Sequence, residues 1–181
     1  MQWRHRISLL TAWCFAAIAA ALATPAIAQS DAGALLDQAI TGEHRTESNR
    51  LRDKYRHPRE TLLFFGLRPD LTVVEIWPGS GWYSEIIGPV LRERGKYYLA
   101  HYALENPKLA DWQREVREKQ QQKIAEQTSV YGKPMFTAFA PPDFLVIAPA
   151  SSVDLVLTFR NVHNWSNQKS DQAAFKAFYN A

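Results

Sequence analysis

Two stretches of the 181-residue sequence carry residues that could bind or act on a small molecule. The first is the turn Pro78-Gly79-Ser80-Gly81, whose glycines permit backbone angles and close approaches that a side chain would forbid. The second contains Asn161 and His163, which also follow an apolar run. Because histidine titrates near neutral pH, His163 is a candidate catalytic base for a hydroxyl or amine substrate. Asn161 is a candidate catalytic and ligand-binding amide beside it.

The spacing of apolar residues predicts the elements that position these stretches. Alternating strands and helices favour a parallel sheet with both faces covered by helices and with right-handed crossovers. Ligands of open α/β sheets bind at the carboxyl ends of the strands, so both stretches are expected at one crevice. Strands are expected at 72–76, 96–101, 135–139 and 153–159, and helices at 32–40, 44–55, 58–65, 82–94, 106–127 and from 171 onward, the last capped by Ser170.

The first 28 residues are expected to be a secretory signal peptide. Arg4 and Arg6 precede an uncharged run over 7–23, and Ala26-Ile27-Ala28 supplies small residues for cleavage after Ala28. The predicted organisation is a signal peptide over 1–28, an N-terminal helical segment over 29–57 and an α/β domain over 58–181. This places the mature chain in the periplasm or outside the cell, without stable membrane association. An uncleaved membrane anchor is the alternative.

Charge and composition argue against several classes of protein. The chain has 21 Lys and Arg and 18 Asp and Glu, and loss of the signal leaves it nearly neutral, which gives no support to nucleic-acid binding. The only cysteine, Cys14, lies in the signal, and the histidines lack the spacing of zinc ligands, so no metal site is predicted. The charged stretch over 44–55 is interpreted as a solvated face rather than an anionic-surface patch.

A serine hydrolase is also a poor match to the sequence. Ser80 does lie between glycines where a strand is expected to turn into a helix. A nucleophile elbow, however, needs small residues two positions to either side of the serine, and Pro78 and Trp82 occupy these places. The glycine turn therefore predicts ligand binding rather than a nucleophile.

Several strings in the right order resemble a known family. The resemblance is to class I S-adenosylmethionine-dependent methyltransferases and, more narrowly, to a group of exported predicted methyltransferases, and it covers about Tyr55 to Ala181. It implies a Rossmann-like three-layer sandwich, S-adenosylmethionine as cofactor and methyl transfer to an acceptor that the sequence does not identify. The strings are Phe64-Phe-Gly-Leu-Arg-Pro69, Val73-Val-Glu-Ile-Trp-Pro-Gly-Ser-Gly81 with Trp82-Tyr83, Asp154-Leu-Val-Leu-Thr-Phe159 and Thr158-Phe-Arg-Asn-Val-His-Asn-Trp165.

The resemblance implies cofactor-binding roles for residues that match the family's pattern. Glu75 matches the acid that ends the first strand, and the turn 78–81 matches the glycine-rich loop, although Trp77 stands where the family usually has glycine. The family places a carboxylate after the second strand to hold the ribose. Here the nearest acid is Glu105, so either Glu105 reaches back or the ribose lacks its bidentate acceptor. Asp143 is expected to meet the adenine or, equally, to fix its own Pro-Pro turn.

The number of predicted strands bears on whether the fold, and with it the binding pocket, is complete. The family usually has seven strands, whereas the sequence predicts four, in the order 3-2-1-4. The expected fold is therefore a partial Rossmann-like sandwich with its C-terminal strands missing, either a fragment or a chain whose pocket is open on one side. The expected partner is a small-molecule ligand. The alternative to a methyltransferase is a non-catalytic exported ligand-binding protein, because a fold does not determine a function.

Overall fold

The computed structural model describes residues 24–181, and the expected signal peptide lies largely outside them. Signal cleavage and export therefore stay predictions. A four-stranded parallel sheet forms the centre, with the order β3-β2-β1-β4. This confirms the predicted Rossmann-like α/β sandwich and its 3-2-1-4 order. The strands are β1 (Thr72–Ile76), β2 (Lys96–His101), β3 (Met135–Ala138) and β4 (Leu155–Thr158).

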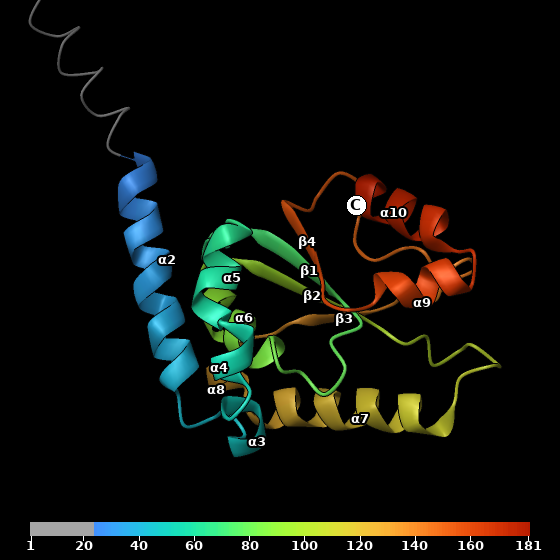
Figure 1. The fold of residues 1–181 in the computed structure, drawn as a ribbon, viewed down its shortest axis with the longest axis horizontal. Coiled ribbons are helices and arrows are strands. Elements are labelled where there is room, and N and C mark those ends of the chain that lie inside the picture. Colours follow the sequence, from blue (N-terminus) through green and yellow to red (C-terminus); the bar gives the residue numbers. More distant parts are fainter. Residues whose placement is uncertain (1–23) are drawn as a thin grey trace, which may run out of the picture.

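Helices cover both faces of the sheet (Figure 1). Successive residues of a strand point to opposite faces, so Val73 and Leu99 pack toward α2, α5 and α6, while Val74 and Ala100 pack toward α9 and α10. Two buried cores result, which is why both faces of the central strands β1 and β2 carry mostly apolar residues. The helices are α2 (Thr24–Thr41), α3 (Glu47–Arg50), α4 (Asp53–Arg56), α5 (Pro58–Phe64), α6 (Ser84–Leu91), α7 (Asp111–Glu126), α8 (Thr128–Tyr131), α9 (Val162–Asn167) and α10 (Asp171–Asn180).

Some predicted helix boundaries and one predicted helix cap were wrong. The expected helix over 44–55 is two short helices, α3 and α4, with a break at Leu51 and Arg52. The expected helix over 106–127 begins only at Asp111, and the expected loop after β4 contains α9. Ser170 does not cap α10 with its side chain; its hydroxyl donates instead to the Trp165 carbonyl, at 3.4 Å.

The N-terminal segment packs against the sheet domain through a shared core and a buried ionic cluster. Leu36 and Ala39 of α2 belong to the same apolar core as β1 and α6. The fully buried side chain of Arg45 donates to both carboxylate oxygens of Asp53, at 2.5 and 2.9 Å, and its Nε lies 3.7 Å from Glu85. Glu85 also accepts a bond from Lys123 of α7, at 2.6 Å. Four separate stretches of chain therefore meet at these charges.

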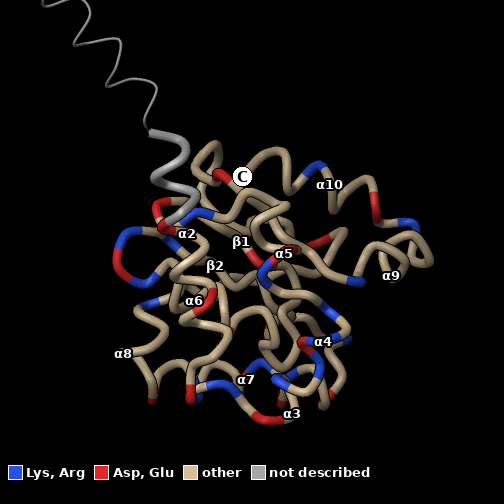
Figure 2. The backbone as a smooth tube through the Cα atoms, turned by 60° about the vertical axis from the view of Figure 1, so that its left-hand side comes forward, with Lys and Arg blue, Asp and Glu red and all other residues tan. Residues whose placement is uncertain are grey.

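Charges elsewhere are distributed over the surface with both signs interspersed (Figure 2). Within the part of the chain that the structure describes, no helix has the length and hydrophobicity that a membrane span needs.

The ionic cluster gives a first testable prediction. Arg45→Met would leave the buried Glu85 and the partly exposed Asp53 without this partner, and we expect the free energy of unfolding to fall by about 3 kcal/mol. Urea denaturation would measure the loss. Arg50→Met is the matched control, because Arg50 is exposed, and we expect it to change stability by less than about 0.5 kcal/mol. Equal effects of the two variants would contradict a structural role for the cluster.

Candidate functional site

A pocket of about 660 Å³ lies at the carboxyl edge of the sheet, within the size range of small-molecule sites. Its walls come from the segments that follow β1, β2 and β3. Trp77, Tyr102 and Phe144 supply aromatic surface. Polar side chains lie among them, namely Asn106, Lys108, Gln113, Asp143, Gln168 and Ser170. A concave cavity with aromatic surface and several polar groups suits a flat ligand that carries hydrogen-bonding atoms.

Trp77 forms one wall of this pocket in an unusual backbone conformation. Its φ is 47°, in the left-handed region where glycine is favoured. The indole N–H donates to the Phe139 carbonyl, at 2.8 Å, and the ring contacts those of Trp165 and Tyr102, each with centroids 5.5 Å apart. These contacts hold a conformation that a tryptophan adopts at a cost, as is common at binding sites.

The glycine turn has an open half and a closed half. Gly79 has a φ of 61°, and a Cβ there would meet nothing within 4 Å. Gly81 has a φ of 87°, and a Cβ there would come within 2.6 Å of Gln120 Nε2 on α7. Ser80 and Gly81 line a cavity of only about 10 Å³, roughly the volume of one water. Space for a ligand is therefore available at Gly79 and not at Gly81.

Glu75 faces the helical layer over α6 and not the pocket. The residue is only 2% exposed, and one carboxylate oxygen accepts bonds from Ser84, at 2.7 Å, and from the Tyr97 hydroxyl. Gln120 donates in turn to the Ser84 hydroxyl, at 2.9 Å. Burial raises the pKa of Glu75 to about 7, although the two hydrogen bonds oppose this shift. In this arrangement Glu75 fixes the start of α6 and thereby the end of the glycine turn.

His101 ends β2 where the resemblance implies a carboxylate. It is fully buried, and burial lowers its pKa to about 4, so the ring is neutral at physiological pH. Its Nδ1 accepts the Tyr102 N–H, at 2.8 Å, which assigns the proton to Nε2. The Gly79 backbone lies near the His101 ring and partly opposes the lowering of the His101 pKa. No hydrogen bond of normal geometry forms at Nε2. A neutral donor therefore lies beside the open half of the turn.

The structure brings some of the predicted binding residues to the pocket and leaves others outside. Asp143 lines it, as expected for a residue that meets the ligand. Glu105 is exposed, does not line the pocket and has the charge of Arg117 nearby. Asn106, which does line the pocket, is a better-placed polar group after β2. Of the turn 78–81, no residue lines the pocket itself; the wall there is Trp77.

The two candidate catalytic residues have different placements. Asn161 is half-buried, and its amide donates to the Ile76 carbonyl and to the Thr158 hydroxyl, both at 3.1 Å, so that it ties the carboxyl ends of β1 and β4 together. His163 is exposed on α9 and does not line the pocket. Trp165 is fully buried and belongs to the core. The second stretch thus supports the edge of the sheet more than it lines the pocket.

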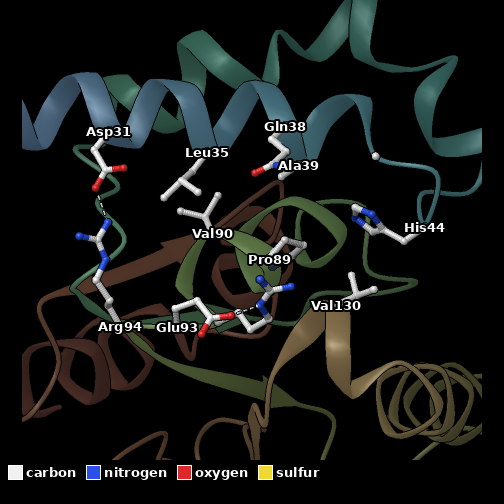
Figure 3. A pocket seen from close by; sticks show the side chains of 12 residues that line it. Asp31, Leu35, Gln38, Ala39, His44, Pro89, Val90, Glu93, Arg94 and Val130 are labelled. Carbon is white, nitrogen blue, oxygen red and sulfur yellow. Dashed lines mark hydrogen bonds and ion pairs between the residues drawn. The ribbon is translucent and has the colours of Figure 1, made fainter.

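A second pocket, of about 380 Å³, lies between α2 and α6 (Figure 3). Leu35 and Val90 form its apolar part. The ion pair of Asp31 with Arg94 closes one end, and His44 lies near the other (Figure 3). This pocket is in the helical layer and away from the carboxyl ends of the strands. Among the described side chains, no group of three His, Cys, Asp or Glu could hold a metal ion.

Sequence reasoning missed several residues of the larger pocket. Tyr102, Asn106, Gln113 and Phe144 lie in loops or on a helix without a recognisable motif. The position of Tyr102 directly after β2 is the one signal that was available, because residues at strand ends share the carboxyl edge.

A parallel sheet of order 3-2-1-4, with a glycine turn after β1 and a pocket at its carboxyl edge, defines a Rossmann-like α/β protein. Comparison of the chain with models of known families, with curated proteins and with solved structures gave no match. The fold class therefore rests on the structure itself.

The raised pKa of Glu75 predicts a specific pH dependence. Between its ordinary value of 4.5 and about 7, the folded state binds more protons at Glu75 than the unfolded state does. The contribution of Glu75 therefore lowers the free energy of unfolding as pH rises through that window, by at most about 3 kcal/mol. Above the window this contribution changes little. Glu75→Gln removes the titration, so the stability of this variant relative to the wild type should increase from pH 5 to pH 7, measured by urea denaturation.

The exposed Glu118 provides the control for this experiment. Glu118→Gln should follow the wild-type pH profile over the same range. Parallel profiles for Glu75→Gln and the wild type would show that Glu75 is ionised in the folded protein throughout.

Proposed function

We propose that this protein binds S-adenosylmethionine at the carboxyl edge of its sheet and transfers the methyl group to a small-molecule acceptor. The observation that carries the proposal is the aromatic pocket of about 660 Å³ at this edge, beside the glycine turn that follows β1. The open space at Gly79 supports it further, because a ligand can approach the backbone there. The sequence resemblance to class I methyltransferases names the cofactor.

The residues of the pocket have chemistry that fits an adenosine group. The rings of Trp77 and Tyr102 offer faces against which a purine can stack. The carboxylate of Asp143 can accept a hydrogen bond from an exocyclic amine, and the amide of Asn106 can bond to ribose hydroxyls. The methionine part would then extend toward Gly79, where an added Cβ would meet nothing within 4 Å.

A second candidate function is ligand binding without catalysis. The observation that favours it is the lining of the pocket, in which Tyr102, Lys108 and Asp143 are the ionisable side chains and His163 is not included. A general base has to lie within hydrogen-bond reach of the proton that it removes. Saturable binding of S-adenosylmethionine without methyl transfer to any acceptor would favour this second candidate.

Calorimetric titration of the purified chain with S-adenosylmethionine tests the proposal. We expect saturable binding with a dissociation constant below about 1 mM, and no saturable heat up to that concentration would end the methyltransferase hypothesis. Gly79→Ala should weaken binding at least about tenfold, since its methyl group occupies the open space beside the turn.

Gly66 supplies a matched control for this substitution. Like Gly79, it has a positive φ, 75°, and nothing within 4 Å of an added Cβ, but it lies between α5 and β1 rather than in the turn that follows β1. Gly66→Ala therefore carries a similar backbone cost, about 1 kcal/mol, without obstructing the ligand. Similar losses of affinity in both variants would assign the effect to stability and not to contact with the cofactor.

A further inference from the structure

Three arginines beside the carboxyl edge have no acidic partner of their own. Arg52 directly precedes α4, Arg56 ends it, and Arg160 is the second residue after β4. Among the described side chains, none of these three guanidinium groups lies within 4.0 Å of a carboxylate. The carboxylate of Asp53 is close by, but Arg45 holds both of its oxygens.

Arg56 is held in place by a rigid aromatic support. Its guanidinium carbon lies 4.7 Å from the centroid of the Trp82 ring, a cation–π contact. Trp82 is itself buried, and its indole N–H donates to the Asn49 carbonyl, at 2.8 Å. The Arg56 carbonyl accepts the Thr61 hydroxyl, at 3.0 Å. A guanidinium group oriented in this way before a ligand arrives loses little conformational freedom on binding.

The positive charges of the three arginines act on one another. Burial lowers the pKa of Arg56, and the charges of Arg52 and Arg160 lower it further, while the Tyr83 hydroxyl and Asp53 oppose the shift. Like charges that are gathered together disfavour the charged state of each. An anion placed among them would relieve this repulsion and gain charge-assisted hydrogen bonds.

The position of Arg160 adds a geometric argument. It has a φ of 62°, a conformation that costs energy for a residue with a side chain, and it is the second residue after β4 ends at Thr158. It therefore lies on the same edge of the sheet as the glycine turn after β1. Figure 2 shows several basic positions along the segment of α3 and α4, with acidic positions among them.

We propose that Arg52, Arg56 and Arg160 form a binding site for a small soluble anion, a phosphate or carboxylate group carried by a substrate. The planar fork of a guanidinium matches both groups. The site goes beyond the proposed function, since anion binding requires no S-adenosylmethionine. If the protein is also a methyltransferase, the anionic group belongs to the methyl acceptor. Only this assignment rests on the proposed function.

Titration of the ¹⁵N-labelled chain with inorganic pyrophosphate, without S-adenosylmethionine, tests this site. We expect saturable shifts of the Trp82 indole and of the backbone amides of Arg56 and Arg160. Arg56→Gln with Arg160→Gln should weaken binding at least about tenfold. Arg68→Gln with Arg94→Gln removes the same charge from two exposed arginines that are paired with Asp70 and Asp31, and should leave the affinity unchanged.

Two outcomes would overturn the site. One is the absence of saturable shifts up to about 10 mM of both pyrophosphate and citrate, and the other is an equal loss of affinity in the two double variants, which would indicate an effect of net charge alone. Citrate, tested in parallel, distinguishes a carboxylate-selective site from a phosphate-selective one. Binding to phosphatidylglycerol vesicles without binding to either small anion would assign the arginines to a membrane surface and reject the proposal. If the double variant fails to fold, the single variant Arg160→Gln is titrated instead, because Arg160 is exposed and its substitution leaves the core intact.

Discussion

The buried guanidinium group of Arg45 is the contact on which the arrangement of the N-terminal segment depends. It joins Asp53 of α4 to Glu85 of α6, and Glu85 in turn joins Lys123 of α7. Buried charges are stable only when they are paired, so these stretches have to assemble together. The short helices α3 and α4 are thereby held against Trp82, next to the glycine turn. Trp82 and Glu85, which follow the turn in the sequence, therefore help to hold the arginines of α4 in place.

The fold could be predicted well from the sequence because its central strands β1 and β2 are buried on both faces. Short, mostly apolar runs rich in β-branched residues, such as 72–76, followed by helical spacing, leave few alternatives to a parallel α/β sheet. Segments without such runs were predicted less well. The helices α3 and α4 are too short to be specified by propensity, and the Trp82–Asn49 bond and the charges of Arg45 determine where they lie. The helix α9 was expected as a loop for the same reason.

The candidate site was only partly visible in the sequence. The glycine turn has a recognisable motif, and its glycines do adopt positive φ angles. The pocket itself combines Trp77, Tyr102 and Phe144 from three separate loops, and such a combination follows from tertiary structure alone. Asn161 is the opposite case. It lies at the strand end where the sequence predicts a site, but its hydrogen bonds to β1 and β4 give it a structural role. Position on the sheet indicates a site, whereas hydrogen-bond partners decide the role of each residue.

Gln120 has a consequence for how fast ligands can bind. Its contact with Ser84 places α7 over Gly81 and leaves Gly79 accessible. A ligand that uses only the accessible half can associate at a rate limited by encounter and orientation, and this rate rises in proportion to its concentration. A ligand that has to reach Gly81 must wait for the Gln120 side chain to leave Ser84, so its observed binding rate reaches a plateau at high concentration. Binding kinetics thus distinguish ligands by the half of the turn that they occupy.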